Sequence, residues 1–460
     1  MRWWAVAFWL LAWQIVSMQI GQEILMVSPV VAGKRLIQLL PEVEFWSTVL
    51  HSTERIMGGF LLGALTGSGV AVLAFRHRKV EELCYPMVCV MKSTPVASVI
   101  ILLLMWMSSG NLSVGIVFLM TFPILYTNVL EGLQQMDPKL TELAEVFELP
   151  KWVRVRWLAI PQLLPYVRAG CALGIGLAWK AGTAAEVIGI SGGTIGEKLY
   201  QAKIYLETAD LLAWTTMILV LSYLFEKLFL RILDMAGDRL KKIQIPESGK
   251  TDEVKNAPEE RQALNQDIVL THLSKRYGDH HVIQDLSRTF PCGQITCLMA
   301  PSGSGKTTLL RLLMGLEVPD SGRIAGLEGR KKSAVFQDQI FGEELSVYAN
   351  IRIMRKRKLF ESESEKQEYE RIKAELEKVG LPGCVDQKVK ELSFGMRQRV
   401  ALVRAFYADW DVLFLDEPFR GLDKSTRELV MEYTRRKCIG KQVLFVTHEE
   451  EEKEAMERYS

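Results

Sequence analysis

Residues 295–313 read Ile295-Thr-Cys-Leu-Met-Ala300-Pro-Ser-Gly-Ser-Gly-Lys306-Thr-Thr-Leu-Leu-Arg-Leu-Leu313. An apolar run, a loop of Gly and Ser, and a helical pattern of Leu follow one another, which predicts a strand, a turn and a helix. Gly303 and Gly305 let the backbone curl so that its N–H groups surround phosphate oxygens at the start of a helix. The alternative, a chance loop of Gly and Ser, does not account for Gly-Lys-Thr-Thr at this place.

The polar side chains of this loop have distinct predicted roles. Lys306 is expected to reach the β- and γ-phosphates of a nucleotide, and Thr307 to offer its hydroxyl to Mg²⁺. The cofactors expected here are therefore ATP and Mg²⁺. Ala300 stands where such loops usually have Gly, so we expect strain or a changed shape there. The residues expected to contact the nucleotide are Ser302, Gly303, Ser304, Gly305, Lys306, Thr307 and Thr308.

A second apolar run, Val412-Leu-Phe-Leu415, ends in Asp416-Glu417-Pro418. Such a run is typical of a buried parallel strand, and ligands of α/β sheets bind at the carboxyl ends of the strands. We expect Asp416 to hold Mg²⁺ and Glu417 to polarise the attacking water. An acidic turn after a strand is common by itself, and it is the glycine loop that favours the functional interpretation.

The two halves of the chain differ in composition. Residues 1–242 carry 21 Lys+Arg and 18 Asp+Glu (16%), whereas residues 243–460 carry 35 and 36 (33%). Ten of the eleven Trp lie in the first half. A membrane region joined to a soluble region divides its residues in this way, and a single soluble globule does not. The net charge of +2 gives no reason to expect a nucleic-acid partner.

The first half is predicted to be an all-α membrane region. A spanning helix needs about 20 largely apolar residues, and six stretches fit: 3–20, 54–75, 83–107, 112–133, 166–189 and 211–230. Basic residues cluster in the connections near 76–79, 139–168 and 227–242, which places these on the cytoplasmic side. Three ionisable residues interrupt the apolar stretches: Lys92, Lys180 and Glu186. They either line a polar transport path, or form an interhelical Lys–Glu pair or extend to the membrane interface.

The connection after the fourth stretch, residues 136–165, is unusually long. It predicts a helix with one apolar face, formed by Leu140, Leu143, Ala144 and Phe147. Pro150 limits this helix, and Pro161 and Pro165 are expected to interrupt the chain before the fifth stretch. Such a helix either lies at the membrane surface or docks into a groove on another domain.

Two resemblances follow from these motifs. Glu142-Leu-Ala144, Ile160-Pro161 and Pro165 resemble the EAA loop of ABC importer permeases, in which this loop is the coupling helix that seats in the ATPase. That family has Ala at the place of Leu143 and Gly at the place of Glu148. Over about residues 28–230 the chain also resembles nitrate/sulfonate/taurine-type permeases, at Ser28-Pro29, Ser52–Arg55, Gly58–Phe60, Lys92–Pro95 and Phe122-Pro123.

Leu392-Ser393-Phe394-Gly395-Met-Arg-Gln-Arg399 resembles the signature motif of ABC ATPases, with Phe394 at the place of the first Gly. The resemblance implies that Ser393 and Gly395 bind the γ-phosphate of nucleotide held by another subunit. It implies four further nucleotide-site positions by order and spacing. Gln337 is the Q-loop residue that contacts Mg²⁺ and senses the coupling helix, Asp423 lies in the D-loop, and His448 is the switch histidine. Tyr277 is implied to stack on adenine.

The predicted architecture is a transmembrane permease domain (1–242), a flexible linker (243–262) and a C-terminally short α/β P-loop ABC ATPase domain (263–460). The expected function is ATP-driven import of a small anionic solute of the nitrate/sulfonate/taurine class. The expected catalytic residues are Glu417, His448 and Gln337, with Thr307, Gln337 and Asp416 on the metal.

A half-transporter of this kind requires a second copy of itself and an extracytoplasmic substrate-binding protein. It would be a multi-pass protein in the lipid of the cytoplasmic membrane, with the ATPase in the cytosol. An ABC exporter, a nucleotide-sensing membrane regulator, and a thiamine-precursor pyrimidine as the cargo stay open as alternatives.

Overall fold

The computed structural model describes residues 3–21, 26–242, 266–301, 303–355 and 365–457. These residues form two compact units. The first unit comprises residues 1–136 and 162–240, and the second comprises residues 137–161 and 241–460. The segment 137–161 thus packs with the C-terminal part of the chain. The linker expected at 243–262 lies outside the described residues.

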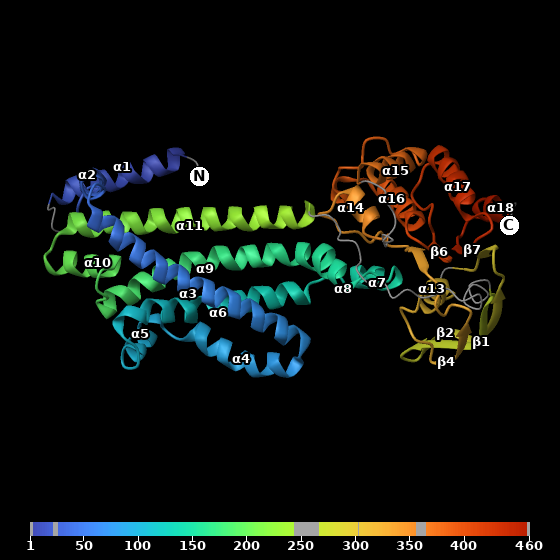
Figure 1. Cartoon of the computed structure of the whole chain (residues 1–460), viewed down its shortest axis with the longest axis horizontal. Helices are drawn as coiled ribbons and strands as arrows, with labels where there is room; N and C mark the ends of the chain where they lie inside the picture. The colour runs from blue at the N-terminus through green and yellow to red at the C-terminus, as the bar shows by residue number, and fades with distance from the viewer. Residues whose placement is uncertain (1–2, 22–25, 243–265, 302, 356–364, 458–460) are drawn as a thin grey trace. The chain divides into compact units, whose positions relative to one another are not determined.

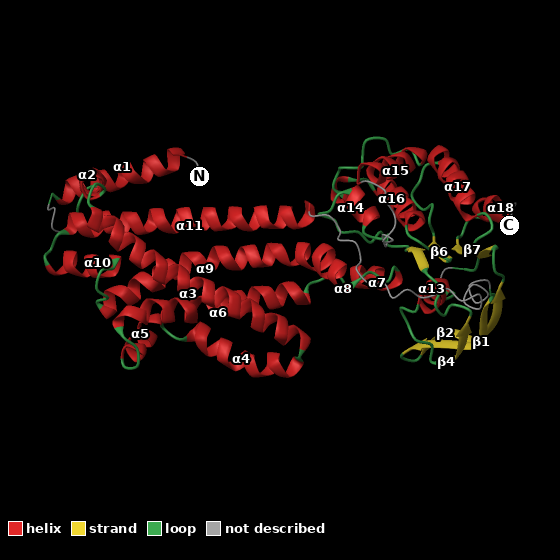
Figure 2. Ribbon diagram, viewed as in Figure 1, coloured by secondary structure: helices red, strands yellow, loops and turns green. Residues whose placement is uncertain are grey.

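The first unit is helical throughout its described part, as Figures 1 and 2 show. Its helices are α1 (Trp3–Ile20), α2 (Pro29–Leu39), α3 (Val43–Arg76), α4 (Arg78–Ser93), α5 (Val96–Leu104), α6 (Ser109–Gln134), α9 (Ile160–Gly189), α10 (Ile195–Ile204) and α11 (Thr208–Lys242). The expectation of an N-terminal helical membrane region is therefore confirmed.

Of the described helices, three are long and apolar enough to cross a membrane. They are α3, α6 and the run Lys151–Gly189, and the bent pair α4 and α5 would make a fourth. Helices α1 and α11 cover the stretches 3–20 and 211–230, for which spanning stays a prediction.

The stretch predicted at 83–107 is not one straight helix, and it would cross a membrane only as a bent pair of helices. Helices α4 and α5 are bent by 101° at their junction. Thr94 has φ −76° and ψ 129°, an extended conformation. Pro95 explains the bend, because a proline lacks an N–H and forces the preceding residue out of the helical region.

The expected interruption at Pro161 and Pro165 is wrong. Both residues lie within α9, which runs without a break from Ile160 to Gly189. The run Lys151–Gly189 is helical on both sides of Pro161, with the π-helical turn η1 (Arg154–Ala159) just before it.

Glycines allow α3 and α6 to approach closely. A Cβ added at Gly59 would lie 2.7 Å from the Val114 carbonyl oxygen, and one at Gly67 would lie 2.7 Å from the Phe122 carbonyl oxygen. Gly63, between them on the same face, would meet the Thr121 hydroxyl. Small residues four apart are a common way for membrane helices to pack backbone against backbone.

The second unit contains two sheets. The antiparallel sheet has the strand order β2-β1-β4 and the parallel sheet the order β3-β7-β6-β5. The strands are β1 (Ile268–Tyr277), β2 (His280–Phe290), β3 (Ile295–Leu298), β4 (Ser321–Ala325), β5 (Lys332–Val335), β6 (Val412–Asp416) and β7 (Gln442–Val446). The helices are α7 (Pro138–Val146), α8 (Lys151–Val153), η1 (Arg154–Ala159), α13 (Lys306–Met314), α14 (Val347–Arg352), α15 (Glu365–Lys378), η2 (Val389–Glu391), α16 (Phe394–Tyr407), α17 (Lys424–Cys438) and α18 (Glu450–Glu457).

The parallel sheet separates two apolar clusters. In β6, Val412 and Phe414 belong to the cluster that includes α13 and the segment 137–161. Leu413 and Leu415, which alternate with them, belong to the cluster formed with α15, α16 and α17. Alternate residues of a strand point to opposite faces, so this strand is buried on both sides. The α/β fold expected for the C-terminal part is confirmed.

Candidate functional site

The glycine loop lies between the end of β3 and the start of α13, as the sequence predicts. Gly303 and Gly305 have φ of 83° and 85°, in the left-handed region that favours glycine. A Cβ at Gly305 would lie 2.9 Å from the Val282 side chain and 3.0 Å from its carbonyl oxygen, so the backbone approaches β2 closely. Ala300 is not among the described non-glycine residues with positive φ, and the strain expected there is not found. Ser302 lies outside the described residues.

Lys306 folds back onto its own loop. Its Nζ donates to the carbonyl oxygens of Ala300 at 2.5 Å and Pro301 at 2.9 Å. The ammonium group therefore lies inside the curl of the loop, next to the N-terminus of α13. Both features attract phosphate oxygens.

A cavity of about 260 Å³ opens beside the loop. Val282 and Val446 form apolar parts of its wall. The remaining lining residues are all residues predicted from the sequence: Gly303, Gly305, Lys306, Thr307, Thr308, Gln337, Asp416, Glu417 and His448. Four separate segments of the chain thus bring their predicted residues to one place.

The two carboxylates at the end of β6 differ in their surroundings. Asp416 is 5% exposed, and burial raises its pKa to about 6, although a hydrogen bond from Thr307 opposes this rise. Glu417 follows with φ 47°, an uncommon backbone conformation for a residue with a side chain. Its Oε1 lies 3.1 Å from Nε2 of His448, which orients the carboxylate toward the cavity wall.

The donor set for a metal is small. The described residues contain no group of three or more His, Cys, Asp or Glu side chains able to hold a metal ion. Thr307 and Asp416 nevertheless place a hydroxyl and a carboxylate in direct contact. Mg²⁺ is usually bound by one or two such side chains together with substrate phosphates and water. The residues present therefore fit Mg²⁺ that arrives with a nucleotide, and they do not form a closed cage.

The signature-like segment forms the start of α16. Ser393 caps this helix, accepting a hydrogen bond from the Met396 N–H at 3.4 Å. Phe394 is 51% exposed, and its ring packs over Gly421, where an added Cβ would lie 2.7 Å from the ring. Gly395 also approaches Gly421, whose carbonyl oxygen would lie 3.4 Å from a Cβ at position 395. The signature-like segment and the D-loop-like segment are therefore in contact.

Asp423 caps α17. Its carboxylate accepts hydrogen bonds from the Thr426 N–H at 3.0 Å and from the Ser425 hydroxyl at 2.7 Å. These bonds hold the pKa of Asp423 well below its usual range. Ser393 and Gly395 lie at the N-terminus of α16, and Asp423 lies at the N-terminus of α17. None of the three is among the residues that line the cavity.

Tyr277 is the last residue of β1 and is 47% exposed. Its hydroxyl donates to Glu317, and Thr308 of the cavity wall is a further hydrogen-bond partner. The amino group of Lys275 lies 5.6 Å from the centre of the ring. The ring is thus held beside the glycine loop with much of its surface open.

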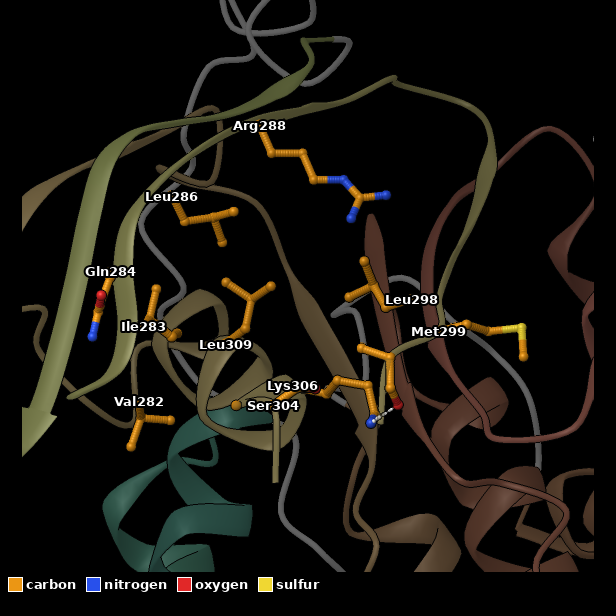
Figure 3. Close-up of a pocket in the computed structure, with 12 residues that line it drawn as sticks. Val282, Ile283, Gln284, Leu286, Arg288, Leu298, Met299, Ser304, Lys306 and Leu309 are labelled. Atoms are coloured by element: carbon orange, nitrogen blue, oxygen red, sulfur yellow. Dashed lines mark hydrogen bonds between the residues drawn. The ribbon is translucent and has the colours of Figure 1, made fainter. Parts of the chain in front are cut away.

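Figure 3 shows a second pocket, of about 270 Å³, that shares Gly305 and Lys306 with the cavity. Its wall is largely apolar and includes Ser304, another predicted contact of the nucleotide. The picture also shows the hydrogen bond from Lys306 to the Ala300 carbonyl. Arg288 lies at one end of this pocket.

Helix α7 docks on the part of its own unit that carries the glycine loop. Glu142 accepts two hydrogen bonds from Arg311 of α13, at 2.9 Å and 2.7 Å. Lys139 donates to Asp338 at 2.6 Å. The predicted apolar face is buried in the same cluster as α13, with Leu140, Leu143, Ala144 and Phe147. Of the two alternatives left open by the sequence, docking into a groove is therefore the one found.

In the first unit, Glu186 is fully buried and accepts hydrogen bonds from the Ser52 hydroxyl at 2.8 Å and the Gly196 N–H at 3.2 Å. Lys92 and Lys180 are exposed. Two helices and the N-terminus of α10 therefore meet at Glu186. The hydrogen-bond partners described for its carboxylate are a hydroxyl and a backbone amide, not a lysine.

Sequence reasoning missed three residues. Gln398 is buried and donates to the Pro418 carbonyl at 2.9 Å, which holds the turn after Glu417. Arg311 and Glu317 connect α7 to Tyr277. Gln398 lies inside the quoted motif, so its position carried a signal. Nothing local distinguishes Arg311 or Glu317, because their partners are distant in the sequence.

Two family models match the chain. Residues 59–242 match the binding-protein-dependent transport system inner membrane component family. Residues 283–420 match the ABC transporter family. The two matched ranges do not overlap, and together they cover parts of both units.

Curated proteins match the C-terminal part. A sulfate/thiosulfate import ATP-binding protein of Synechococcus elongatus is 38% identical over 200 residues, which are 40% of this chain and 56% of that protein. The protein of the same description from Ralstonia nicotianae is 38% identical over 198 residues, 40% of this chain and 53% of that protein. The chain thus spans about half the length of these relatives.

Among solved structures, the dimeric post-hydrolysis state of an ATP-binding cassette bound to ADP and Pi matches with a TM-score of 0.38 and 24% identity, over 41% of this chain and 90% of that chain. A dimeric bacterial ABC transporter cassette matches with a TM-score of 0.37 and 25% identity, over 42% and 91%. The family matches show that residues 59–242 are similar to the inner membrane components of binding-protein-dependent transport systems and that residues 283–420 are similar to ABC transporters.

Proposed function

We propose that this protein uses ATP hydrolysis to import a small anionic solute across the cytoplasmic membrane, with the ATP-binding domain in the cytosol. The observation that carries the proposal is the paired hydrogen bonding of Glu142 with Arg311. Glu142 belongs to the connection between α6 and α9, two apolar helices, and Arg311 belongs to the helix that starts at the glycine loop. A movement of that loop on nucleotide binding would therefore move the connection between α6 and α9.

The residues around the cavity suit phosphoryl transfer to water. Lys306 and the N–H groups of the loop bind the phosphates and stabilise charge that develops on them. Glu417 orients the attacking water and His448, bonded to it at 3.1 Å, holds the carboxylate in place. Thr307, Asp416 and Gln337 would hold Mg²⁺, which when bound neutralises phosphate charge. Tyr277 would stack on the adenine.

A complete site of this class requires a second copy of the chain. Ser393, Gly395 and Asp423 lie at the N-termini of α16 and α17, away from the cavity formed by Lys306 and Asp416. In a homodimer these residues would face the nucleotide bound by the other copy, and helix N-termini are suited to a phosphate. An extracytoplasmic binding protein would deliver the solute, in keeping with the family matched by residues 59–242.

The cargo is the least constrained part of the proposal. The relatives of the ATP-binding domain carry the name sulfate/thiosulfate import, and the permease motifs resemble those of nitrate, sulfonate and taurine carriers. All of these solutes are small and carry an oxyanion group, so a small oxyanion is the cargo class proposed. A thiamine-precursor pyrimidine is the alternative that the same permease resemblance allows.

Uptake into membrane vesicles tests the proposal. Vesicles with the full-length protein, ATP and its binding protein should accumulate sulfate, thiosulfate, nitrate, a sulfonate or taurine, with a labelled pyrimidine as the competing cargo. Glu417→Gln should abolish ATP turnover and uptake while the protein still binds ATP. Glu428→Gln makes the same chemical change on the exposed side of α17 and should leave both rates unchanged.

The other outcomes contradict the proposal. ATP-driven export would identify an exporter. ATP binding without turnover in the unmodified protein would identify a nucleotide-sensing regulator. Equal turnover with Glu417→Gln would refute the role given to that carboxylate.

A further inference from the structure

Four side chains from separate parts of the second unit form one continuous chain of hydrogen bonds. Glu142 accepts from both terminal nitrogens of Arg311, at 2.9 Å and 2.7 Å. Nε of the same guanidinium donates to Oε1 of Glu317 at 2.6 Å. The other oxygen of Glu317, Oε2, accepts from the Tyr277 hydroxyl. This chain of hydrogen bonds runs from the docked helix α7, through Arg311 of α13, to the aromatic ring of Tyr277 beside the glycine loop.

The two carboxylates share a single guanidinium, so their interactions are not independent. Arg311 presents its fork to Glu142 and only its Nε to Glu317, and all three groups are partly buried. The bonds with Glu142, and then those with Glu317, raise the pKa of Arg311. Burial alone would raise the pKa of Glu317, but the bonds from Tyr277 and Arg311 lower it. The Glu317 carboxylate therefore interacts with Arg311 as a charged group.

Loss of the Glu142 carboxylate would change the far end of this chain. The fork of Arg311 would then lack its charged partner, and Glu317 is the neighbouring carboxylate able to pair with it in a bidentate manner. Each oxygen can accept two hydrogen bonds, but a carboxylate that turns both oxygens toward the guanidinium would move Oε2 away from the position in which it now accepts from the Tyr277 hydroxyl. The Tyr277 hydroxyl would lose its hydrogen bond to Glu317 and keep the one with Thr308, so one of the two bonds that hold the ring would be broken.

A second contact of the same helix does not reach Tyr277. Lys139 of α7 pairs with Asp338 at 2.6 Å, on the segment that follows β5. This pair also holds α7 on the ATP-binding domain, but its bonds do not join the chain through Arg311. Lys139→Met therefore offers a matched control for Glu142→Gln, since each substitution removes one ion pair from the docked helix.

We propose that Glu317 is a positioning residue that couples the docking of α7 to the affinity for the nucleotide base, by way of Arg311 and Tyr277. The inference rests on the proposed function in one respect, namely that Tyr277 stacks on adenine. The two states are Tyr277 held by Glu317, with α7 docked, and Tyr277 released, with Arg311 fully paired to Glu317. Thermodynamic linkage requires that the base, by favouring the held ring, strengthens the docking of α7 by the same factor.

The test is a set of equilibrium binding measurements on the full-length protein in lipid nanodiscs. The probes are ATP and inorganic triphosphate, which has phosphates but no base. Glu142→Gln should raise the Kd for ATP about fivefold, near the lower end of typical coupling between sites. It should leave the Kd for triphosphate within a factor of two. Lys139→Met should change neither value by more than that factor.

Tyr277→Phe keeps the ring and removes the hydroxyl, and Glu317→Gln keeps the shape and removes the charge. In either background, Glu142→Gln should have no further effect on the Kd for ATP. The inference is overturned if the effects of Glu142→Gln and Tyr277→Phe multiply, if triphosphate affinity falls with ATP affinity, or if Lys139→Met acts as Glu142→Gln does. Failure of the unmodified protein to bind ATP would instead overturn the proposed function itself.

Discussion

Replacement of Leu143 by Ala tests how α7 is held. Leu143 is 0% exposed and belongs to the apolar cluster that α7 shares with α13 and β6. Removal of a fully buried Leu side chain costs about 2–5 kcal/mol, because apolar contact is lost and a cavity is left. This cost falls on the docked state of α7, so the docking equilibrium should weaken by about 30-fold to several thousand-fold. The change also gives the chain the residue that the EAA-type pattern has at this position.

The measurement compares ATP turnover with uptake in the same vesicles. The cavity around Lys306 does not include Leu143, so ATP turnover at saturating ATP should stay within about threefold of the unmodified rate. Uptake per ATP hydrolysed should fall at least tenfold, because α7, which connects α6 to α9, is then held less firmly on α13. Leu143→Met, which nearly conserves volume and costs less than about 1.5 kcal/mol, is the matched control. Equal uptake per ATP in the Ala and Met variants would refute the reasoning.

Three stability predictions concern single residues. Glu148 has φ 47°, so Glu148→Gly should be more stable than Glu148→Ala by about 0.5–1 kcal/mol in thermal unfolding, the relief of left-handed strain less the entropy of glycine. Gly421→Ala should destabilise the protein by about 1–2 kcal/mol because of its φ of 75° alone. A further steric cost comes from the Phe394 ring and should disappear in the Phe394→Ala background. Equal losses in both backgrounds would show that the ring does not contact residue 421. Ser52→Ala should cost about 1–3 kcal/mol by leaving the buried Glu186 short of a donor, while Ser47→Ala on the exposed start of α3 should change stability little.

Local motifs predicted most of the site. The loop 300–308 and the acidic end of β6 are encoded by neighbouring residues, because the backbone itself needs glycine for its curl and an apolar strand before the carboxylates. The same holds for α7, whose apolar face at Leu140 and Leu143 proves to be buried. Nine predicted residues line the cavity; of these, Gln337 and His448 were implied by the resemblance to ABC ATPases.

Partners distant in the sequence were not predictable. Arg311 lies 169 residues from Glu142, and no spacing rule connects two residues so far apart. The bend between α4 and α5 is a different case. Hydrophobicity gave one stretch over 83–107, and the conformational limit that Pro95 imposes on Thr94 overrode it. The hydrophobicity of a segment predicts whether it can lie in a membrane, whereas single residues such as Pro95 set the direction of its backbone.

The two departures from the ABC pattern find different explanations in the structure. Ala300 has no positive φ, so the position does not require glycine and the substitution carries no backbone strain. Phe394 has a compensating residue, because Gly421 leaves the space that its ring occupies. The ring then ties the start of α16 to the turn before Asp423, and any movement of one segment toward a second copy would carry the other with it. Neither departure therefore argues for a silent nucleotide sensor, and the pairing of Phe394 with Gly421 favours a signature segment and D-loop that close as one body.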